Sequence, residues 1–196
     1  MPRQLSAGLS VKVTKSSLPE VLCLEPEVHR DERGSFVETF QAARYGEMGI
    51  SAPFAQDSIS RSTKHTLRGL HFQEPNAQGK IVFVVRGAIF DVAVDIRRGS
   101  PRFGQWCGVE LSEENRKQVW IPAGFAHGFL TLSEVADVYY KLTAPYAPEC
   151  EHRIQWNDPA IGIRWPIEQQ PHISAKDLAA PPLASAPVLP RYGGAS

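Results

Sequence analysis

The run TLRGLHFQ, residues 66–73, places a histidine where an ordinary strand would continue with branched aliphatic side chains. Neutral imidazole suits general base catalysis because its unperturbed pKa is about 6.5. Arg68 stands three residues before His71, and Lys80 follows after a turn. One interpretation of the run is a pocket that holds a base beside cationic side chains. A core or surface histidine would fit the same position.

Two later stretches also carry polar side chains that packing alone does not require. PAGFAHGF, residues 122–129, is expected to be a glycine-flanked loop that carries His127. In VYYKLTAPY, residues 138–146, Tyr140 shares a strand face with Val138 and Leu142, so its ring is expected to point inward. A buried tyrosine with a purely packing role would look the same.

A third polar stretch, DERGSFVETF, spans residues 31–40. Strand alternation predicts that Arg33 and Ser35 lie on one face, with Phe36 and Glu38 on the other. These side chains could bind a ligand, but an exposed edge strand would have a similar composition.

The two histidines raise the question of a metal site. Small β-barrels often hold a metal through a His-x-His pair, a carboxylate and a later histidine. Here the residue two positions after His71 is Gln73, and His127 is alone in its stretch. A histidine pair without a third ligand is a weak site. We therefore expect a pocket with histidines but no metal, which disfavours a metal-dependent oxygenase.

The elements that must position these residues are short strands separated by turns. In AIFDVAVDI, residues 88–96, apolar side chains alternate with Asp91, Ala93 and Asp95. Similar runs stand at residues 80–85, 105–111, 117–122 and 136–144. This spacing predicts an all-β sandwich or barrel. One short helix is expected over residues 41–49, ending at Gly49.

Composition narrows the class of protein. The chain has 196 residues, of which 42% are hydrophobic, which suits one domain with a sizeable core. The 21 basic and 21 acidic residues balance, which disfavours nucleic acid as a partner. Three widely spaced cysteines indicate reduced thiols. The first ten residues lack the apolar stretch of a signal peptide, and no apolar run is long enough to span a membrane. We expect a cytoplasmic protein.

Six stretches, taken in order, resemble the dTDP-4-dehydrorhamnose 3,5-epimerase family. They cover most of the chain, from about residue 20 to residue 180, and read DERGSF, LRGLHFQ, QGKIVFVVRGAIFDVAVDIRRGSPRFGQW, WIPAGFAHGF, YYKLTAPYAPECE and WNDPAIGIRWP. The resemblance implies an all-β, double-stranded β-helix (a cupin-like jelly roll) with a few short helices. It also implies a homodimer and no cofactor. We expect a single domain over residues 1–180, followed by a tail over residues 181–196 whose Pro-, Ala- and Gly-rich composition is typical of a segment that wraps the surface or frays.

The resemblance further implies the substrate and the site. The substrate would be dTDP-4-keto-6-deoxy-D-glucose, inverted at C3 and C5 through enolates during deoxysugar biosynthesis of the dTDP-L-rhamnose type. His71 matches the family's base, Asp177 in SAKDLAA its carboxylate partner and Tyr140 its general acid, and Lys80 would hold the enolate oxygen. The matching substrate-binding positions, some of them expected across a dimer, are Arg33, Phe36, Glu38, Gln56, Ser58, Arg68, His127, Tyr146, Glu151 and Lys176.

One departure from the family pattern concerns Ser58. The family usually reads QDN before SRS, whereas this chain reads QDSIS, so an amide is replaced by a shorter hydroxyl. Two rival functions stay open at this point. One is an epimerase that inverts only C3 or only C5 of a related nucleotide sugar. The other is a sugar-nucleotide-binding cupin without activity.

Overall fold

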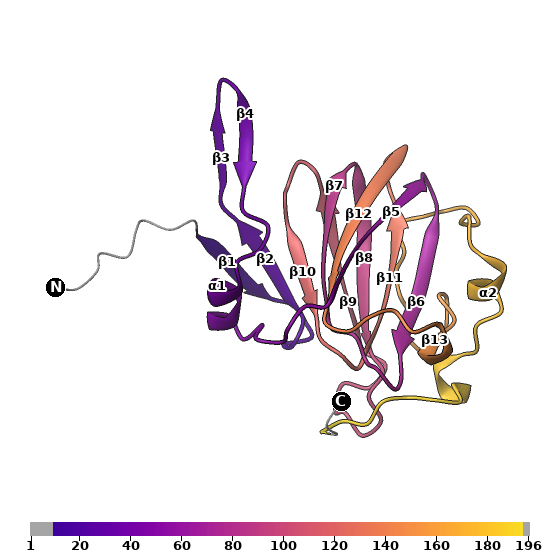
Figure 1. Cartoon of the computed structure of the whole chain (residues 1–196). Coiled ribbons are helices and arrows are strands. Elements are labelled where there is room, and N and C mark those ends of the chain that lie inside the picture. The colour runs from indigo at the N-terminus through magenta and orange to yellow at the C-terminus, as the bar shows by residue number, and fades with distance from the viewer. Residues whose placement is uncertain (1–9, 194–196) are drawn as a thin grey trace.

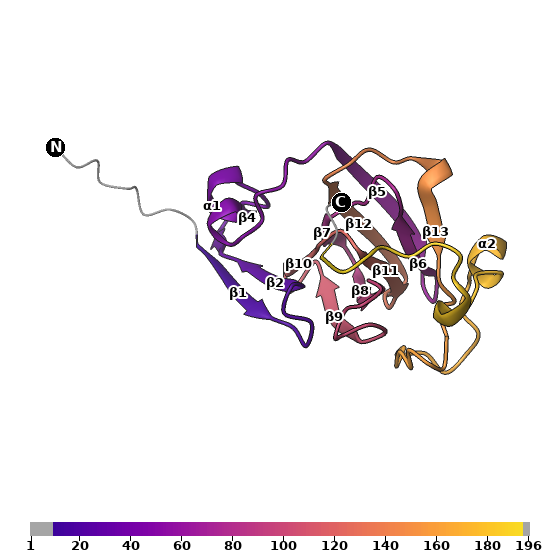
Figure 2. The same ribbon diagram turned by 90° about the horizontal axis from the view of Figure 1, so that it is seen from below.

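The strands form two main antiparallel sheets and one small hairpin (Figure 1). The computed structural model describes residues 10–193, so the first nine residues, examined above for a signal peptide, lie outside it. A six-stranded sheet has the order β1-β2-β10-β7-β12-β5, and a five-stranded sheet has the order β13-β6-β11-β8-β9. Figure 2, a view turned by 90°, shows these sheets facing each other as the two walls of a barrel. The prediction of an all-β jelly roll is confirmed.

The bounds of the elements are as follows. The six-stranded sheet consists of β1 (Val11–Lys15), β2 (Leu22–Pro26), β10 (Gln118–Ile121), β7 (Lys80–Arg86), β12 (Val135–Leu142) and β5 (Gln56–Thr63). The five-stranded sheet consists of β13 (Glu151–Arg153), β6 (Leu67–Gln73), β11 (Phe125–Thr131), β8 (Ala88–Asp95) and β9 (Trp106–Ser112). The hairpin is β3 (Val28–Asp31) with β4 (Gly34–Val37), and the helices are α1 (Ala42–Glu47) and α2 (Ala175–Leu178), with 3₁₀ turns at Pro148–Cys150 and Leu183–Ser185.

Strand β8 shows why the five-stranded sheet is buried on both faces. Ile89 and Ala93 belong to the core between the sheets, whereas Val92 and Val94 belong to a second core outside the five-stranded sheet. The segment that follows β13 covers this outer face, and its Leu183 is only 4% exposed. Within the Pro- and Ala-rich C-terminal stretch, Leu183, Ala186 and Leu189 pack in this outer core, and residues 194–196 lie outside the described part.

The predicted helix is present as α1. The Gln41 side chain accepts a hydrogen bond from the Arg44 backbone at 2.6 Å, which satisfies one free N–H of the first turn. Gly49 has φ of +86° just past the helix end, a conformation that favours glycine. Tyr45 anchors the helix because its buried hydroxyl donates to Gln118 at 2.7 Å. Among residues 10–193, no helix is long and apolar enough to cross a membrane.

Two predictions about local structure are wrong. The expected loop at residues 122–129 is strand from residue 125 onward, because Phe125–Thr131 form β11, which is buried along its whole length. Its glycine suits a crowded strand, since a Cβ at Gly128 would lie 2.8 Å from the Arg68 carbonyl oxygen. The alternating stretch at 31–40 is interrupted by a turn, since β3 ends at Asp31 and β4 begins at Gly34.

A bulge in β6 explains how Arg68 and His71 lie on one side of the sheet although they are three residues apart. His71 pairs with His127, and Arg68 pairs with Phe129, so three steps on β6 oppose two steps on β11. Gly69 accommodates the extra residue with φ of +128°, and a Cβ there would lie 2.5 Å from the Gly128 Cα. The register shift turns both polar side chains toward the space between the sheets.

We expect Gly69→Ala to destabilise the protein by about 2 kcal/mol or more, because the new methyl group would clash with backbone at a strained φ. Gly46→Ala is the matched control, since Gly46 lies in α1 with open space around it. The control should be neutral or stabilising by up to about 1 kcal/mol. Chemical denaturation of both variants measures the difference. Equal stability of the two variants would refute the crowding argument.

Candidate active site

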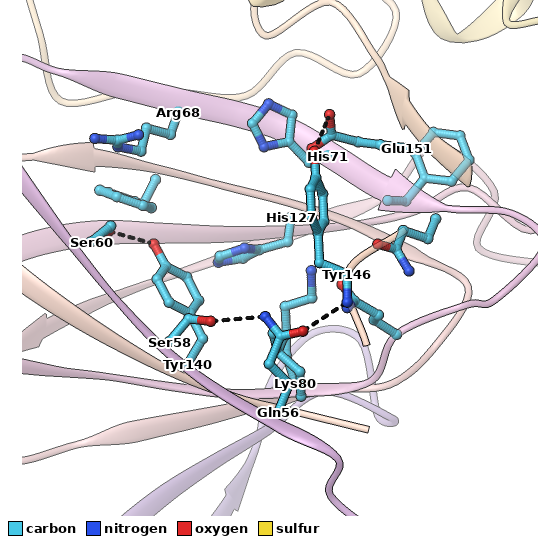
Figure 3. Close-up of a pocket in the computed structure, with 15 residues that line it drawn as sticks. Gln56, Ser58, Ser60, Arg68, His71, Lys80, His127, Tyr140, Tyr146 and Glu151 are labelled. Carbon is cyan, nitrogen blue, oxygen red and sulfur yellow. Dashed lines mark hydrogen bonds between the residues drawn. The ribbon is translucent and has the colours of Figure 1, made fainter. Parts of the chain in front are cut away.

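A cavity of about 410 Å³ opens between the two sheets (Figure 3). Strand β6 supplies Arg68 and His71 from one sheet, and β12 and β7 supply Tyr140 and Lys80 from the other. The cavity brings together most of the residues expected at the site. Those that line it are Gln56, Ser58, Arg68, His71, Lys80, His127, Tyr140, Tyr146 and Glu151.

His71 and Asp177 form a hydrogen-bonded pair. The His71 Nε2 atom lies 2.7 Å from Asp177 Oδ1, and the side chains are 31% and 6% exposed. Because an ionised carboxylate only accepts hydrogen bonds, Nε2 donates to Asp177, and in the neutral ring Nδ1 keeps a free lone pair. Burial alone would raise the pKa of Asp177, but hydrogen bonds from His71, Gly69 and Ser174 outweigh burial and hold that pKa below its usual value. The pair therefore offers a basic nitrogen backed by a carboxylate.

A second histidine–aspartate pair lies deeper in the same cavity. His127 Nε2 is 2.7 Å from Asp91 Oδ2, and these side chains are 6% and 1% exposed. Burial lowers the pKa of His127 despite the neighbouring carboxylate, and the nearby Lys80 and His71 lower it further. The imidazole is therefore neutral at pH 7 and donates Nε2–H to Asp91.

Lys80 is a buried cation at the cavity wall, with 7% of the residue exposed. Burial lowers the pKa of its ammonium to about 8, although the carboxylates of Asp91 and Glu151 act in the opposite direction. The side chain is thus protonated at pH 7 and close to its titration range. A charged donor in a poorly hydrated cavity interacts strongly with a developing negative charge.

Tyr140 points into the cavity from β12, as the alternation with Val138 and Leu142 predicted. Its hydroxyl oxygen is 3.0 Å from Ser60 Oγ on the neighbouring strand β5. Burial raises the pKa of Tyr140, and the hydrogen bond with Ser60 offsets only part of this effect. The phenol therefore keeps its proton at neutral pH.

The inward face of β5 is a row of serines, each of which contacts a different side chain of the cavity. Ser58 accepts from Gln56 Nε2 at 2.9 Å, and Gln56 in turn accepts from the Tyr146 backbone N–H at 2.7 Å (Figure 3). Ser62 accepts from Arg68 Nε at 2.9 Å. The Ser58 hydroxyl thus helps to fix the loop that carries Tyr146.

Five of the expected residues do not line this cavity within the described chain, although one of them, Asp177, is hydrogen-bonded to His71 at its wall. Arg33 and Phe36 lie on the projecting β3–β4 hairpin, where Phe36 is 62% exposed. Glu38 is paired with Arg44 beside α1. Lys176 borders a smaller neighbouring hollow of about 240 Å³ that shares Glu151 with the cavity.

Sequence reasoning missed several polar residues at the site. Ser60, Gln73 and Gln78 line the cavity, Asp91 accepts from His127, and Arg153 donates to Asp177. Ser60 could have been found, because strand alternation places it on the same face as Ser58. Asp91 could not, because alternation sets it opposite the apolar Val92 and Val94, which only the structure places in the core outside the sheet. Arg153 could not, because it reaches Asp177 from a three-residue strand with no periodic signal. Residues 10–193 contain no group of three His, Cys, Asp or Glu side chains arranged to hold a metal ion.

Taken together, the barrel and its cavity have the features of an acid–base enzyme of the jelly-roll class. The family model described as dTDP-4-dehydrorhamnose 3,5-epimerase matches residues 15–185. The chain is 56% identical to the dTDP-4-dehydrorhamnose 3,5-epimerase of Salmonella typhimurium strain LT2, over 89% of this chain and 96% of the relative. The chain belongs to the dTDP-4-dehydrorhamnose 3,5-epimerase family.

Solved structures agree with this assignment. The crystal structure of dTDP-6-deoxy-D-glucose-3,5-epimerase from Legionella pneumophila Philadelphia 1, in complex with dTDP-4-keto-L-rhamnose, is 50% identical. It superposes with a TM-score of 0.92 and covers 94% of this chain and 100% of that one. A 3′-monoepimerase from Streptomyces bikiniensis in complex with dTDP-quinovose is 37% identical, with a TM-score of 0.85 and coverage of 91% and 92%. The prediction of a 3,5-epimerase is confirmed, and the single-carbon alternative is not favoured.

We expect the Lys80 ammonium to titrate near pH 8, because burial disfavours its charged form. Carbon-13 NMR of protein labelled at lysine would show one resonance with this midpoint, well below the value of about 10.4 typical of surface lysines. Lys80→Met should remove that resonance and so identify it. A Lys80 midpoint above 10 would show that the cavity is better hydrated than its burial indicates.

Proposed function

We propose that the cavity binds dTDP-4-keto-6-deoxy-D-glucose and inverts C3 and C5 through enolates, as a step of dTDP-L-rhamnose-type biosynthesis. One observation carries the proposal: the His71–Asp177 pair and the Tyr140 phenol project from opposite sheets into one cavity. Inversion requires removal of a proton from one face of the sugar and its return on the other. A sugar held between the two sheets would present one face to each group.

The first step would use the free Nδ1 of His71. The C4 ketone acidifies the hydrogens on C3 and C5, because each resulting carbanion is an enolate. We propose that His71 removes the proton and that Asp177 stabilises the imidazolium through its 2.7 Å hydrogen bond. The substrate ketone supplies the electron sink, so this chemistry needs no cofactor. Cofactor independence stays a prediction.

The enolate oxygen needs a donor, and Lys80 supports this role. Its buried ammonium is charged at pH 7 and adjoins the same cavity as His71. One donor to an oxyanion contributes about 3 kcal/mol to a transition state. We propose that the neutral His127, fixed by Asp91, lies against the sugar as a further binding residue.

The nucleotide part would be held by local charge, since the chain has no net charge. We propose that Arg68, oriented by its hydrogen bond to Ser62, and Lys176 bind the diphosphate. Gln56, Ser58, Tyr146 and Glu151 would enclose the rest of the substrate.

We further propose a homodimer in which the β3–β4 hairpin reaches the cavity of the second copy. Figure 1 shows the hairpin projecting away from the barrel, and its Arg33 side chain is 86% exposed. An exposed aromatic residue, Phe36, beside an exposed cation suits a partner surface better than solvent. In this arrangement Arg33, Phe36 and Glu38 would bind substrate across the interface.

The cytoplasmic location expected from the sequence stays a prediction.

His71→Asn should abolish exchange of solvent deuterium at both C3 and C5, whereas Asp177→Asn should leave weak exchange. The base is chemically required, while the carboxylate orients and stabilises it. Loss of general base assistance costs about 10² to 10⁴ in rate. Proton NMR of the substrate in D₂O reports each carbon separately. Wild-type exchange in His71→Asn would disprove the assignment of the base.

Tyr140→Phe should reduce inversion at C5 much more than it reduces exchange. The enolate still forms, and His71 can return deuterium to the original face, but the donor on the other face is gone. The two rates can be measured in one NMR sample. Tyr139→Phe is the matched control, because the neighbouring Tyr139 faces outward, stacked on Phe83. If exchange and inversion fall by the same factor in Tyr140→Phe, the phenol does not serve as the proton donor.

A further inference from the structure

The Asp177 carboxylate is shared between two donors. Its Oδ1 atom accepts from His71 Nε2 at 2.7 Å and from Arg153 Nε at 3.1 Å. The Asp177 side chain is 6% exposed and that of Arg153 is 22% exposed, so water screens this contact only in part. The pair proposed as the catalytic base is therefore a triad that includes a permanent cation.

The fold places Arg153 beside the pair by strand register. Strand β13 pairs with β6 so that Arg153 lies directly opposite His71. Helix α2, capped by Ser174, brings Asp177 against both residues from the C-terminal segment. The outer nitrogen of Arg153 also contacts the Glu151 carboxylate, two residues earlier on the same face of β13. The guanidinium is thus held between two carboxylates and has little freedom to leave Asp177.

The contact with Arg153 changes what Asp177 can do for His71. A guanidinium stays charged throughout the working pH range. It donates to the same Asp177 oxygen that must stabilise the His71 imidazolium. The positive charge of the guanidinium also repels the positive charge that the His71 ring acquires on protonation. Both effects favour neutral His71, the form able to remove a proton.

Other charged and titratable side chains also surround His71 and Asp177, and they come from several elements. They are Glu151 on β13, Lys176 on α2, Arg68 on β6, His127 on β11 with Asp91 on β8, Lys80 on β7, and the phenols of Tyr140 on β12 and Tyr146. Arg153 differs from these cations because it bonds the same carboxylate oxygen as the imidazole.

We propose that Arg153 is a positioning residue that holds Asp177 and lowers the proton affinity of the His71–Asp177 pair. It thereby sets the pH below which the enzyme loses activity. This inference rests on the proposed role of His71 as the base. Arg153 does not line the cavity, and it acts through its hydrogen bond to Asp177.

The test is the titration of the His71 ring, followed by NMR of protein labelled at histidine and assigned with His71→Asn. Arg153→Met keeps an unbranched side-chain stem but removes the guanidinium and its charge. It should raise the His71 midpoint by about one pH unit. The acidic limb of kcat/KM should move upward by the same amount, because the base must be neutral to act. Arg153→Gln provides a second neutral variant should the methionine variant fold poorly.

Two further variants control for charge and for position. Arg61 also forms an ion pair with a carboxylate, that of Asp137, but on the exposed outer face. Arg61→Met removes this guanidinium, and the titration midpoint of His71 should not move. Removing Arg153 also uncovers the Glu151 carboxylate, which would act in the same direction. The shift caused by Arg153→Met should therefore persist when Glu151 is already glutamine.

Three results would overturn the inference. An unchanged His71 midpoint in folded Arg153→Met and Arg153→Gln, with a rate lowered equally at every pH, would mean a purely structural role. A shift that disappears in the Glu151→Gln background would assign the effect to Glu151. A shift of equal size in Arg61→Met would make it a general effect of net charge. If instead the midpoint shifts but His71→Asn retains exchange, the electrostatic coupling stands and the proposed base is wrong.

Discussion

The close approach of the two backbones at Gly69 and Gly128 is the constraint on which the cavity depends. A regular β6 strand would direct Arg68 and His71 to opposite faces of the sheet. The bulge turns both into the cavity while Leu70 points to the second core on the other side, where it is fully buried. The register shift at the bulge therefore places an apolar side chain in the second core and polar side chains in the cavity. A side chain at either glycine would push β6 and β11 apart where their histidines face each other.

The C-terminal segment then completes the site from behind. Asp177 lies 106 positions after His71 in the sequence and reaches it only because the chain returns along the five-stranded sheet after β13. Leu183 and Ala186 bury themselves in the second core and hold this return in place. Burial of apolar side chains far from the cavity thus positions the carboxylate, which links the stability of the outer core to the geometry of the His71–Asp177 pair.

The sequence predicted the elements with clear periodicity and missed what depends on register. Alternation identified the strand at residues 88–96 and, around Tyr140, also the inward face, because side-chain direction in a strand is a local property. It did not show which face of residues 88–96 lies toward the cavity, because that strand is buried on both faces. The strand at β11 was mistaken for a loop, since its glycine resembles a turn signal, although here it permits close packing against β6. The resemblance, rather than any pattern, supplied Asp177. Neither strand periodicity nor the resemblance identified Arg153, because its role arises from its position opposite His71 on the neighbouring strand.

The two histidine–aspartate pairs consist of the same chemical groups but differ in how deeply their histidines are buried. Both have a 2.7 Å hydrogen bond from Nε2, but the His127 side chain is 6% exposed whereas that of His71 is 31% exposed. Burial lowers the pKa of His127, so a proton gained there would be costly. A base that must gain a proton in each cycle and return it to solvent needs the more accessible position. This contrast supports assigning proton removal to His71 and a fixed, neutral binding role to His127. It also explains why a permanent cation beside Asp177 would be useful. The more hydrated pair lacks the burial that keeps His127 neutral, and Arg153 can supply that bias by charge instead.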